Sequence, residues 1–439
     1  MLKKIAVNNF RSLEDFSMEI RPGLNALVGP NGAGKTSIIK WFEFLSLLGS
    51  FSLRESIGKI GGANHVFRRK GEKYSEMLNF SFTGTTQINS FSRRNSRNGS
   101  KIYIDYEYDG TISVVKNQIF FSRQTISVFI SSNNKPSSKN IYIDWSYDIL
   151  TDKIECKIET AAPKSFKKDS LEHFYFEKKF LEEVLNSHSM LESMIVPGQI
   201  FPIDYLFAIK TDISYRKAFN INPSQVRSAI DISSQPNVQF DGAGTVSTLY
   251  EIKSQALGER NRYKLTPLDR FRQKTTLPRL IDYFKLSDSN ISDINIEIEN
   301  FRNEFTLEVE YKNESSTYKV PIFLLSDGTA KWISLITAIS TERKAIFIEE
   351  PENFLHPKLQ ESIVEIIRGE IDGGDGERFS LITTHSETLL NKLNPEEIII
   401  VKMNDGRTCA ERIPDPEEIS KIIADCGFGL GYFYVTGGF

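Results

Sequence analysis

Residues 24–42 read LNALVGPNGAGKTSIIKWF, and this stretch decides the fold. Residues 24–28 form a mainly apolar run that predicts a buried strand, and apolar side chains recur at helical spacing from residue 35 to about residue 48. The segment between them satisfies the pattern G-x-x-x-x-G-K-[ST] from Gly29 to Thr36. A strand, a glycine-rich turn and a helix, in that order, predict a loop that binds phosphate groups.

The chemistry of such a loop gives its residues separate roles. Glycines let the backbone turn so that successive amide hydrogens point at a phosphate, and the helix that follows adds its positive end. We expect Lys35 to reach the β- and γ-phosphates and Thr36 to supply a hydroxyl group to Mg²⁺. The predicted nucleotide-binding residues of the loop are Asn31, Gly32, Gly34, Lys35, Thr36 and Ser37.

The bulk composition is that of a globular chain. Its 439 residues are 40% hydrophobic and 25% charged, with a formal net charge of -3 and a pI near 6.1. The chain can therefore bury a large core, and it lacks the basic field of a dedicated nucleic-acid coat. Three widely spaced cysteines suit a reducing compartment. No stretch approaches about 18 consecutive apolar residues, so we expect a cytoplasmic protein that does not span a membrane.

The flanking sequence predicts an α/β fold with inserted elements. Short strands are expected at residues 2–7 and 17–20. From about residue 72 to residue 160, apolar and polar residues alternate between Asp-Gly, Asn-Asn and Pro-Ser turn signals. This pattern predicts an antiparallel sheet.

Helical spacing follows at residues 171–194 and from residue 247 to about residue 284, where Pro267 and Pro278 are expected to break the helix. The chain then returns to strands before helices and strands alternate. We predict three parts, which are an N-terminal lobe (1–165), a mainly helical insert (166–290) and a C-terminal lobe (291–439).

The stretch LLSDGTAKWISLITAIS at residues 324–340 is a second motif. Taken alone, Ser-Asp-Gly is more often a plain turn, with Ser326 as the cap of the helix that follows. The segment resembles the ABC signature Leu-Ser-Gly-Gly-Gln, with Asp327 in place of a glycine. In ABC ATPases this serine and the nearby glycine amides bind the γ-phosphate of ATP held by the opposite protomer. The resemblance implies that Ser326 and Gly328 bind ATP and that the chain forms a homodimer or higher homo-oligomer.

Two further motifs follow in the order found in ABC ATPases. In KAIFIEEPENFLHP, an apolar strand ends at Glu349 and Glu350, which could also be a solvated acidic turn. By resemblance to the Walker B motif, Glu349 would hold Mg²⁺ and Glu350 would polarise the attacking water. In SLITTHSETLL, His385 follows another apolar strand and resembles the switch histidine that contacts the γ-phosphate, although a lone histidine is usually structural.

Other segments resemble the RecF/OLD-like ATPases of bacteria, namely NNFRSL, GGANHVFRR, FDGAGTVSTLYEIK, EEPENFLHP and GLGYFYVTGGF. Arg11 resembles an arginine that approaches the nucleotide in this branch, the alternative being an ordinary strand-end arginine. Many members serve in antiphage defence, and the chain looks most like the PtuA ATPases of Septu systems, with the AriA ATPases of PARIS systems second. The resemblance implies a separately encoded effector, either a PtuB-like HNH nuclease or a Toprim-type protein.

No nuclease domain is expected within this sequence. OLD-type relatives add a Toprim domain after the histidine motif, which takes about 100 residues or more. About 50 residues follow His385, so nuclease activity would come from a partner.

Two other functions compete with this interpretation. A RecF-type ATPase would clamp DNA with basic residues, which makes DNA a further candidate partner. Its candidate contacts are Arg68, Arg69, Lys70 and the cluster at residues 93–97, although such a cluster is more often a solvated loop. A transporter ATPase fits poorly, because the insert between the motifs is long and no glutamine has the context of a Q-loop. The candidates for that glutamine are Gln87, Gln118 and Gln124.

Overall fold

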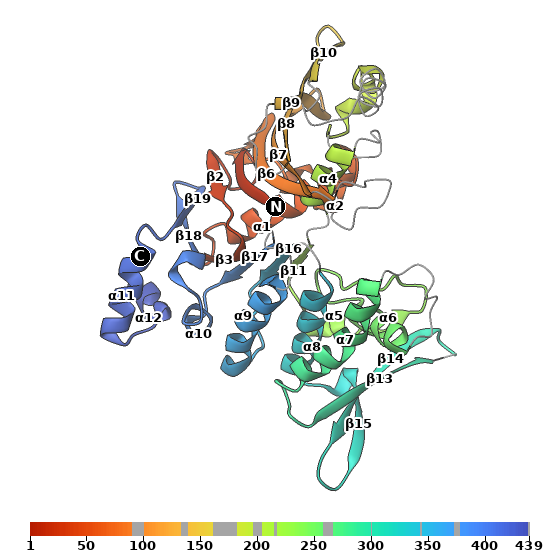
Figure 1. Cartoon of the computed structure of the whole chain (residues 1–439). Helices are drawn as coiled ribbons and strands as arrows, with labels where there is room; N and C mark the ends of the chain where they lie inside the picture. The colour runs from red at the N-terminus through yellow and green to blue at the C-terminus, as the bar shows by residue number, and fades with distance from the viewer. Residues whose placement is uncertain are drawn as a thin grey trace. The chain divides into compact units, whose positions relative to one another are not determined.

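The computed structural model describes residues 1–89, 101–132, 139–160, 182–195, 204–214, 217–257, 267–299, 301–342, 345–372 and 378–437. The chain forms two compact units whose segments interleave along the sequence (Figure 1). Unit 1 comprises Met1–Pro22, Gly29–Arg216 and Ile400–Glu411, and unit 2 comprises Gly23–Val28, Lys217–Ile399 and Arg412–Phe439. The division into parts 1–165, 166–290 and 291–439 stays a prediction.

Unit 1 is built on a seven-stranded antiparallel sheet in the order β10-β9-β8-β7-β6-β1-β2. Its strands are β1 (Leu2–Asn8), β2 (Phe16–Glu19), β6 (Met77–Asn89), β7 (Lys101–Val115), β8 (Gln118–Ser132), β9 (Lys139–Asp148) and β10 (Lys153–Thr160). Alternating residues produce the sheet, as in β2, where Phe16 and Met18 are buried and Ser17 and Glu19 are exposed. The predicted antiparallel sheet is confirmed.

The helix after the phosphate loop, α1 (Lys35–Leu48), is anchored in an aromatic core. Trp41 makes edge-on contacts with Phe10 and with Phe80 of β6, each at 5.2 Å between ring centroids. Trp41 is fully buried, and burial of an aromatic ring of this kind stabilises the fold by about 2–3 kcal/mol. The loop therefore precedes a helix whose position in unit 1 is fixed.

The other elements of unit 1 are shorter. They are α2 (Leu53–Lys59), η1 (Ala63–His65), β4 (Arg69–Lys70), β5 (Lys73–Tyr74), η2 (His188–Leu191) and α4 (Asp204–Ile213). Two strands, β18 (Ile398–Asn404) and β19 (Arg407–Arg412), have most of their residues in unit 1 and the rest in unit 2. Of the helix predicted at residues 171–194, the described part begins at residue 182.

Unit 2 contains four parallel strands in the order β11-β16-β17-β3, namely β11 (Lys217–Phe219), β16 (Ala345–Glu349), β17 (Phe379–Thr384) and β3 (Gly23–Val28). Every residue of β17 is buried, as expected for a strand covered on both faces. Glu349 pairs with Thr383, and Val28 pairs with Thr384. The carboxyl ends of β16, β17 and β3 therefore share one edge, which in open α/β sheets is the ligand-binding edge.

Unit 2 also has a small antiparallel sheet, made of β12 (Ile230–Asp231), β13 (Ile291–Glu299), β14 (Glu304–Lys312) and β15 (Thr317–Pro321). Its helices are α5 (Pro223–Val226), α6 (Thr245–Leu257), α7 (Pro267–Phe284), η4 (Ile322–Leu324), α8 (Asp327–Thr341), α9 (Pro357–Asp372), α10 (Glu387–Leu390), η5 (Pro395–Glu397), α11 (Pro416–Cys426) and α12 (Leu430–Val435). None of the described helices is long and apolar enough to cross a membrane.

Helix α7 corrects one prediction. It begins at a proline, but Pro278 lies inside the helix and does not break it. An internal proline removes a backbone hydrogen bond and costs about 3 kcal/mol. Tertiary contacts after the proline offset this cost, because Phe284 is fully buried and the indole of Trp332 in α8 donates to the Tyr283 carbonyl at 2.8 Å.

Candidate functional site

The phosphate loop in unit 1 depends on two close backbone approaches. Gly34 has φ 102°, and a Cβ there would lie 1.9 Å from the Thr408 hydroxyl. A Cβ at Gly29 would lie 2.1 Å from the Val401 carbonyl oxygen. Gly32 is also left-handed, at φ 80°, but a Cβ there would meet nothing within 4 Å. Only glycine satisfies both the backbone conformation and the space at Gly34.

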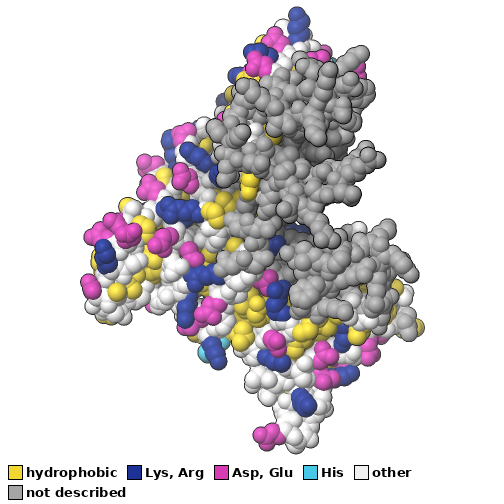
Figure 2. All heavy atoms as spheres, in the orientation of Figure 1, with side chains coloured by type: hydrophobic (Ala, Val, Ile, Leu, Met, Phe, Trp, Pro, Cys, Tyr) yellow, Lys and Arg dark blue, Asp and Glu magenta, His cyan; other side chains and the backbone are white. Residues whose placement is uncertain are grey.

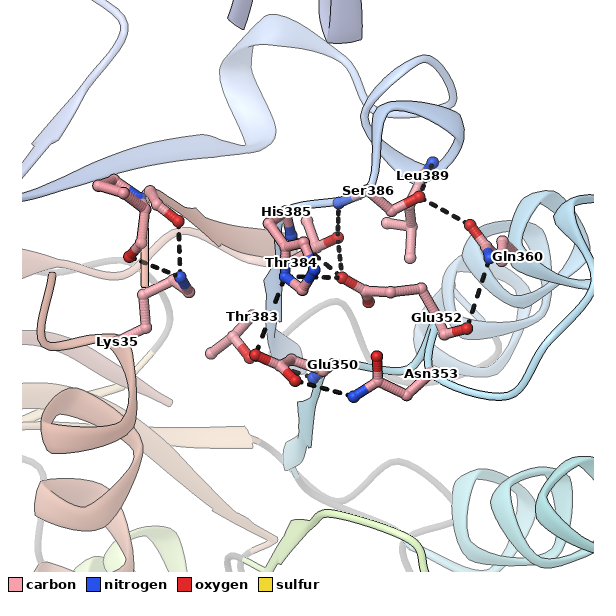
Figure 3. A network of polar contacts seen from close by, with 12 residues as sticks. Lys35, Glu350, Glu352, Asn353, Gln360, Thr383, Thr384, His385, Ser386 and Leu389 are labelled. Carbon is pink, nitrogen blue, oxygen red and sulfur yellow. Dashed lines mark hydrogen bonds and ion pairs between the residues drawn. The ribbon is translucent and has the colours of Figure 1, made fainter. Parts of the chain in front are cut away.

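Lys35 lies over this loop. Its side chain is buried, and Nζ donates to the carbonyl of Gly29 at 2.6 Å and to that of Pro30 at 3.1 Å (Figure 3). The residue before α1 is Gly34, which has no side chain with which to cap the helix, and the first turn of α1 contains no acidic residue. A cation, left-handed glycines and a helix start without a side-chain cap fit a bound phosphate chain.

The segment around Arg11 is tied to α1. Ser12 Oγ donates to Ser37 Oγ at 2.9 Å and forms a 2.7 Å hydrogen bond with Thr408 Oγ1. Arg11 has a left-handed backbone, with φ 49°, and its Nε donates to the His65 carbonyl at 2.6 Å. The structure therefore places Arg11 next to a residue that contacts the nucleotide-binding candidate Ser37.

At the sheet edge of unit 2, the chain turns sharply after Glu349. Glu350 has φ 45°, a conformation that costs a non-glycine residue about 1–2 kcal/mol. Its amide donates to both the carbonyl and the hydroxyl of Thr383, each at 3.1 Å. Asn353 Nδ2 donates to Glu350 Oε2 at 2.8 Å (Figure 3). These bonds fix the carboxylate of Glu350, which is a third exposed, at the carboxyl end of β16.

Glu352 joins this turn to the histidine motif. Its carboxylate is buried, and Oε1 accepts hydrogen bonds from the Thr384 hydroxyl at 2.8 Å and from the His385 amide at 3.0 Å (Figure 3). His385 Nδ1 lies 3.6 Å from Glu352 Oε1 and 3.9 Å from Glu350 Oε1. Glu350 and His385 therefore face one another. Glu352 positions the histidine segment, and it is a residue that the sequence pattern did not predict.

The signature segment leads into α8. Ser326 is exposed and caps the helix, since its Oγ accepts from the Thr329 amide at 3.1 Å, which confirms the predicted cap. A Cβ at Gly328 would lie 2.8 Å from the carbonyl oxygen of Phe354, so α8 begins directly against the turn at residues 349–354.

Lys331 fastens α8 to the same turn. Its side chain is 1% exposed, and Nζ donates to the Glu350 carbonyl at 3.1 Å. Burial lowers the pKa of Lys331 from 10.5 to about 8, although the carboxylates of Glu352 and Glu350 act in the opposite direction. The sequence pattern did not predict a role for Lys331 either. The signal that could have revealed it is a lysine among the apolar residues on the buried face of a helix.

The basic residues proposed for DNA are partly neutralised. Glu14 lies 3.2 Å from Arg68, 2.5 Å from Lys70 and 3.0 Å from Arg407. The pKa of Glu14 is lowered, chiefly by the hydrogen bond from Lys70, and then by the charges of Arg68 and Arg407 against the opposing effect of burial. Arg69 Nε donates to a loop carbonyl at 2.9 Å.

The remaining candidates are a basic cluster, a Q-loop glutamine and groups of side chains that could bind a metal ion. The cluster at residues 93–97 lies outside the described residues. Gln124 is fully buried and donates to the Ser193 carbonyl at 2.9 Å while accepting from Tyr108 Oη at 2.7 Å, which is a structural role. Among the described residues, no group of three His, Cys, Asp or Glu side chains is arranged to hold a metal ion.

Two family models match the chain. Residues 4–220 match a family described as "AAA domain", and residues 208–391 match one described as "AAA domain, putative AbiEii toxin, Type IV TA system". Between them they relate nearly all of the chain up to the histidine motif to AAA-type ATPases.

The curated relatives match over shorter regions. The DNA replication and repair protein RecF of Erwinia tasmaniensis is 27% identical over 144 residues, which is 33% of this chain and 38% of that protein. The RecF protein of Moorella thermoacetica is 42% identical over 50 residues, 11% of this chain and 14% of that protein. The OLD nuclease of Thermus scotoductus is 58% identical over 45 residues, 10% of this chain and 8% of that protein. The chain thus aligns with well under half the length of these relatives.

The solved structure of an SmcHead bound to the C-winged helix domain of ScpA has a TM-score of 0.50, at 12% identity, and covers 96% of this chain and 99% of that one. This likeness shows that the chain has the fold of that head domain, and it confirms the predicted α/β fold with an antiparallel β subdomain.

Proposed function

We propose that this chain, related to AAA-type ATPases and to RecF and OLD nuclease, binds and hydrolyses ATP and closes as a homodimer around the nucleotide. The phosphate loop carries the proposal, because a buried Lys35 lies over left-handed glycines at a helix start that has no side-chain cap. The exposed, helix-capping Ser326 supports the dimer, since it presents a second anion-binding helix start to solvent.

In this proposal each candidate has a role. The phosphates are held by the loop residues Asn31, Gly32, Gly34, Lys35, Thr36 and Ser37, and Arg11 approaches the base or the phosphates of the nucleotide. Thr36 and Glu349 would hold Mg²⁺, which neutralises charge on the phosphate oxygens when bound. Glu350, held by Asn353, polarises the attacking water, and His385 contacts the γ-phosphate. Ser326 and Gly328 face the triphosphate held by the second protomer.

The physiological role that we propose is control of a separately encoded effector in antiviral defence in the cytoplasm. The effector would be a PtuB-like HNH nuclease or a Toprim-type protein. Support comes from the segments that resemble RecF/OLD-like ATPases, many of which serve in antiphage defence, and from the match to OLD nuclease. ATP binding would favour one assembly state and loss of ATP another, which requires the two states to differ in ATP affinity.

A RecF-like DNA clamp is the second candidate, supported by the RecF relatives that match a third of the chain. On the face shown in Figure 2, lysines and arginines are interspersed with acidic side chains over the coloured atoms. Ion pairs with Glu14 also reduce the charge that Arg68 and Lys70 offer to a phosphate backbone. Binding of duplex DNA by the isolated protein, weakening steeply with salt, would favour this candidate over effector control.

Two variants test the shared ATPase proposal. Lys35→Ala should abolish binding of a fluorescent ATP analogue, because the loop loses its cation. Glu350→Gln should keep nucleotide binding, lower the hydrolysis rate by about 100-fold or more and accumulate dimers with ATP and Mg²⁺ in analytical ultracentrifugation. Normal turnover in Glu350→Gln would refute the assignment of Glu350.

A further inference from the structure

The signature segment carries a carboxylate where the ABC signature has a glycine, and an arginine faces that carboxylate. Asp327 is the first residue of α8, and its side chain is 54% exposed. Nη2 of Arg227 lies 2.7 Å from Asp327 Oδ1, and the same nitrogen donates to the Leu325 carbonyl at 2.6 Å. One guanidinium group therefore holds the residues on both sides of Ser326.

Arg227 comes from a packed element. It is the C-cap residue directly after α5, and the preceding Val226 is fully buried. A Cβ at Gly242 would lie 2.7 Å from Val226 Cγ2 and 3.0 Å from Ser334 Oγ of α8. Helices α5 and α8 therefore both pack closely against the backbone at Gly242. The Arg227 side chain is itself only 23% exposed. Its guanidinium is therefore fixed in one position, unlike that of a long side chain that moves freely in solvent.

The charge of this pair matters at a phosphate-binding helix start. A first-turn aspartate stabilises its own helix, but it opposes the approach of any other anion to the same amides. A triphosphate carries several negative charges, so an unpaired Asp327 beside Ser326 and Gly328 would repel it. With Arg227 in ion-pair contact, the segment presents no net charge while its helix start remains positive.

We propose that Arg227 belongs to the surface that reads ATP bound by a second copy of this chain. Arg227 cancels the charge of Asp327 and fixes the turn at Leu325, so that Ser326 and Gly328 can face the γ-phosphate of the partner's nucleotide. Arg227 and Asp327 together replace the glycine of the ABC signature. This inference rests on the proposed nucleotide-sandwich dimer, and it makes Arg227 a positioning residue that acts through Asp327 and the turn.

The test measures ATP-dependent dimerisation in the Glu350→Gln background by analytical ultracentrifugation with ATP and Mg²⁺. Adding Arg227→Met should weaken the dimer by about tenfold or more, because the carboxylate is left unpaired at the interface. Adding Asp327→Gly to that variant should restore most of the affinity, since the repelling charge is then gone. Arg227→Lys should fall in between, because it keeps the charge but loses the two-way contact.

Controls separate this effect from misfolding. Arg302→Met removes an exposed arginine of unit 2 that lies 3.9 Å from Glu299, and it should leave the dimer unchanged. Binding of a fluorescent ATP analogue should also remain within about twofold in every variant, because the phosphate loop is intact.

The outcomes are distinguishable. Absence of any ATP-dependent dimer in Glu350→Gln alone would overturn the proposed function and this inference with it. If that parent dimerises and Arg227→Met dimerises equally well, the inference alone fails. If Asp327→Gly brings no recovery to Arg227→Met, the arginine serves only to join α5 to α8, and the inference again fails.

Discussion

The phosphate loop and the turn at residues 349–354 hold their charged groups in opposite ways. In the loop, backbone groups hold the charge, because two carbonyls accept hydrogen bonds from the Lys35 ammonium and Gly34 takes a left-handed conformation. In the turn, side chains from several elements converge. Asn353 holds the Glu350 carboxylate, and Lys331 from α8 holds the Glu350 carbonyl. Substitutions in the loop should therefore affect folding and nucleotide binding, whereas substitutions around the turn should affect the rate of hydrolysis.

The largest effect is expected from Gly34→Ala. The new Cβ would collide with the Thr408 hydroxyl, 1.9 Å away, at a backbone φ of 102°. We expect the free energy of unfolding in urea to fall by about 3 kcal/mol and ATP-analogue binding to be lost. The matched control is Gly32→Ala, which is also left-handed but meets no atom within 4 Å. It should cost about 1 kcal/mol, and an equal loss in both variants would show that the contact with Thr408 is unimportant.

Glu352→Ala should give the next largest effect, and on rate rather than binding. It removes the acceptor of the hydrogen bonds from the Thr384 hydroxyl and the His385 amide. A hydrogen bond to a charged acceptor is worth about 1.5–3 kcal/mol. If the transition state loses about that much stabilisation, kcat for ATP should fall about 10- to 150-fold, with KM within twofold. The control is Glu361→Ala, which removes a half-buried glutamate 3.2 Å from Lys392. A rise in KM without a change in kcat would contradict the assigned role.

Lys331→Met should give the smallest effect, and one of opposite sign on stability. Burial lowers the pKa of Lys331 from 10.5 to about 8, so keeping it charged at pH 7 costs about 3 kcal/mol, against about 1 kcal/mol for the lost bond to the Glu350 carbonyl. The variant should therefore be more stable by about 1–2 kcal/mol at pH 7, while kcat falls.

The pH dependence sharpens this prediction. Between pH 8 and 10.5 the unfolded chain keeps the lysine proton and the folded chain has released it, so the stability of the natural protein rises with pH in that window. The advantage of Lys331→Met in urea unfolding should shrink accordingly from pH 7 to pH 10. An advantage that stays constant with pH would show that burial does not perturb this lysine.

The sequence predicted those parts of the molecule whose signals are local. The helix Lys35–Leu48 and the buried strands that precede Glu350 and His385 follow from spacing within short segments. Pro278 was wrongly expected to break a helix, because the contact that supports that helix comes from Trp332, far along the chain. The same reason explains why the sequence did not predict Lys331, Glu352 and Arg227. Their partners are brought close by the tertiary fold, and no regular spacing in the sequence identifies them.

The interleaving of the two units has a consequence for how the chain acquires its structure. The strand that leads into the phosphate loop, β3, pairs with β17, so that Gly23 meets Phe379. During synthesis on the ribosome, β3 cannot pair with β17 until almost the whole chain has been made. Pairing between strands so far apart in sequence is also slow. Neither unit is a continuous stretch of chain, so truncation cannot yield either one intact, and nascent chains that stop short of β17 are expected to depend on chaperones.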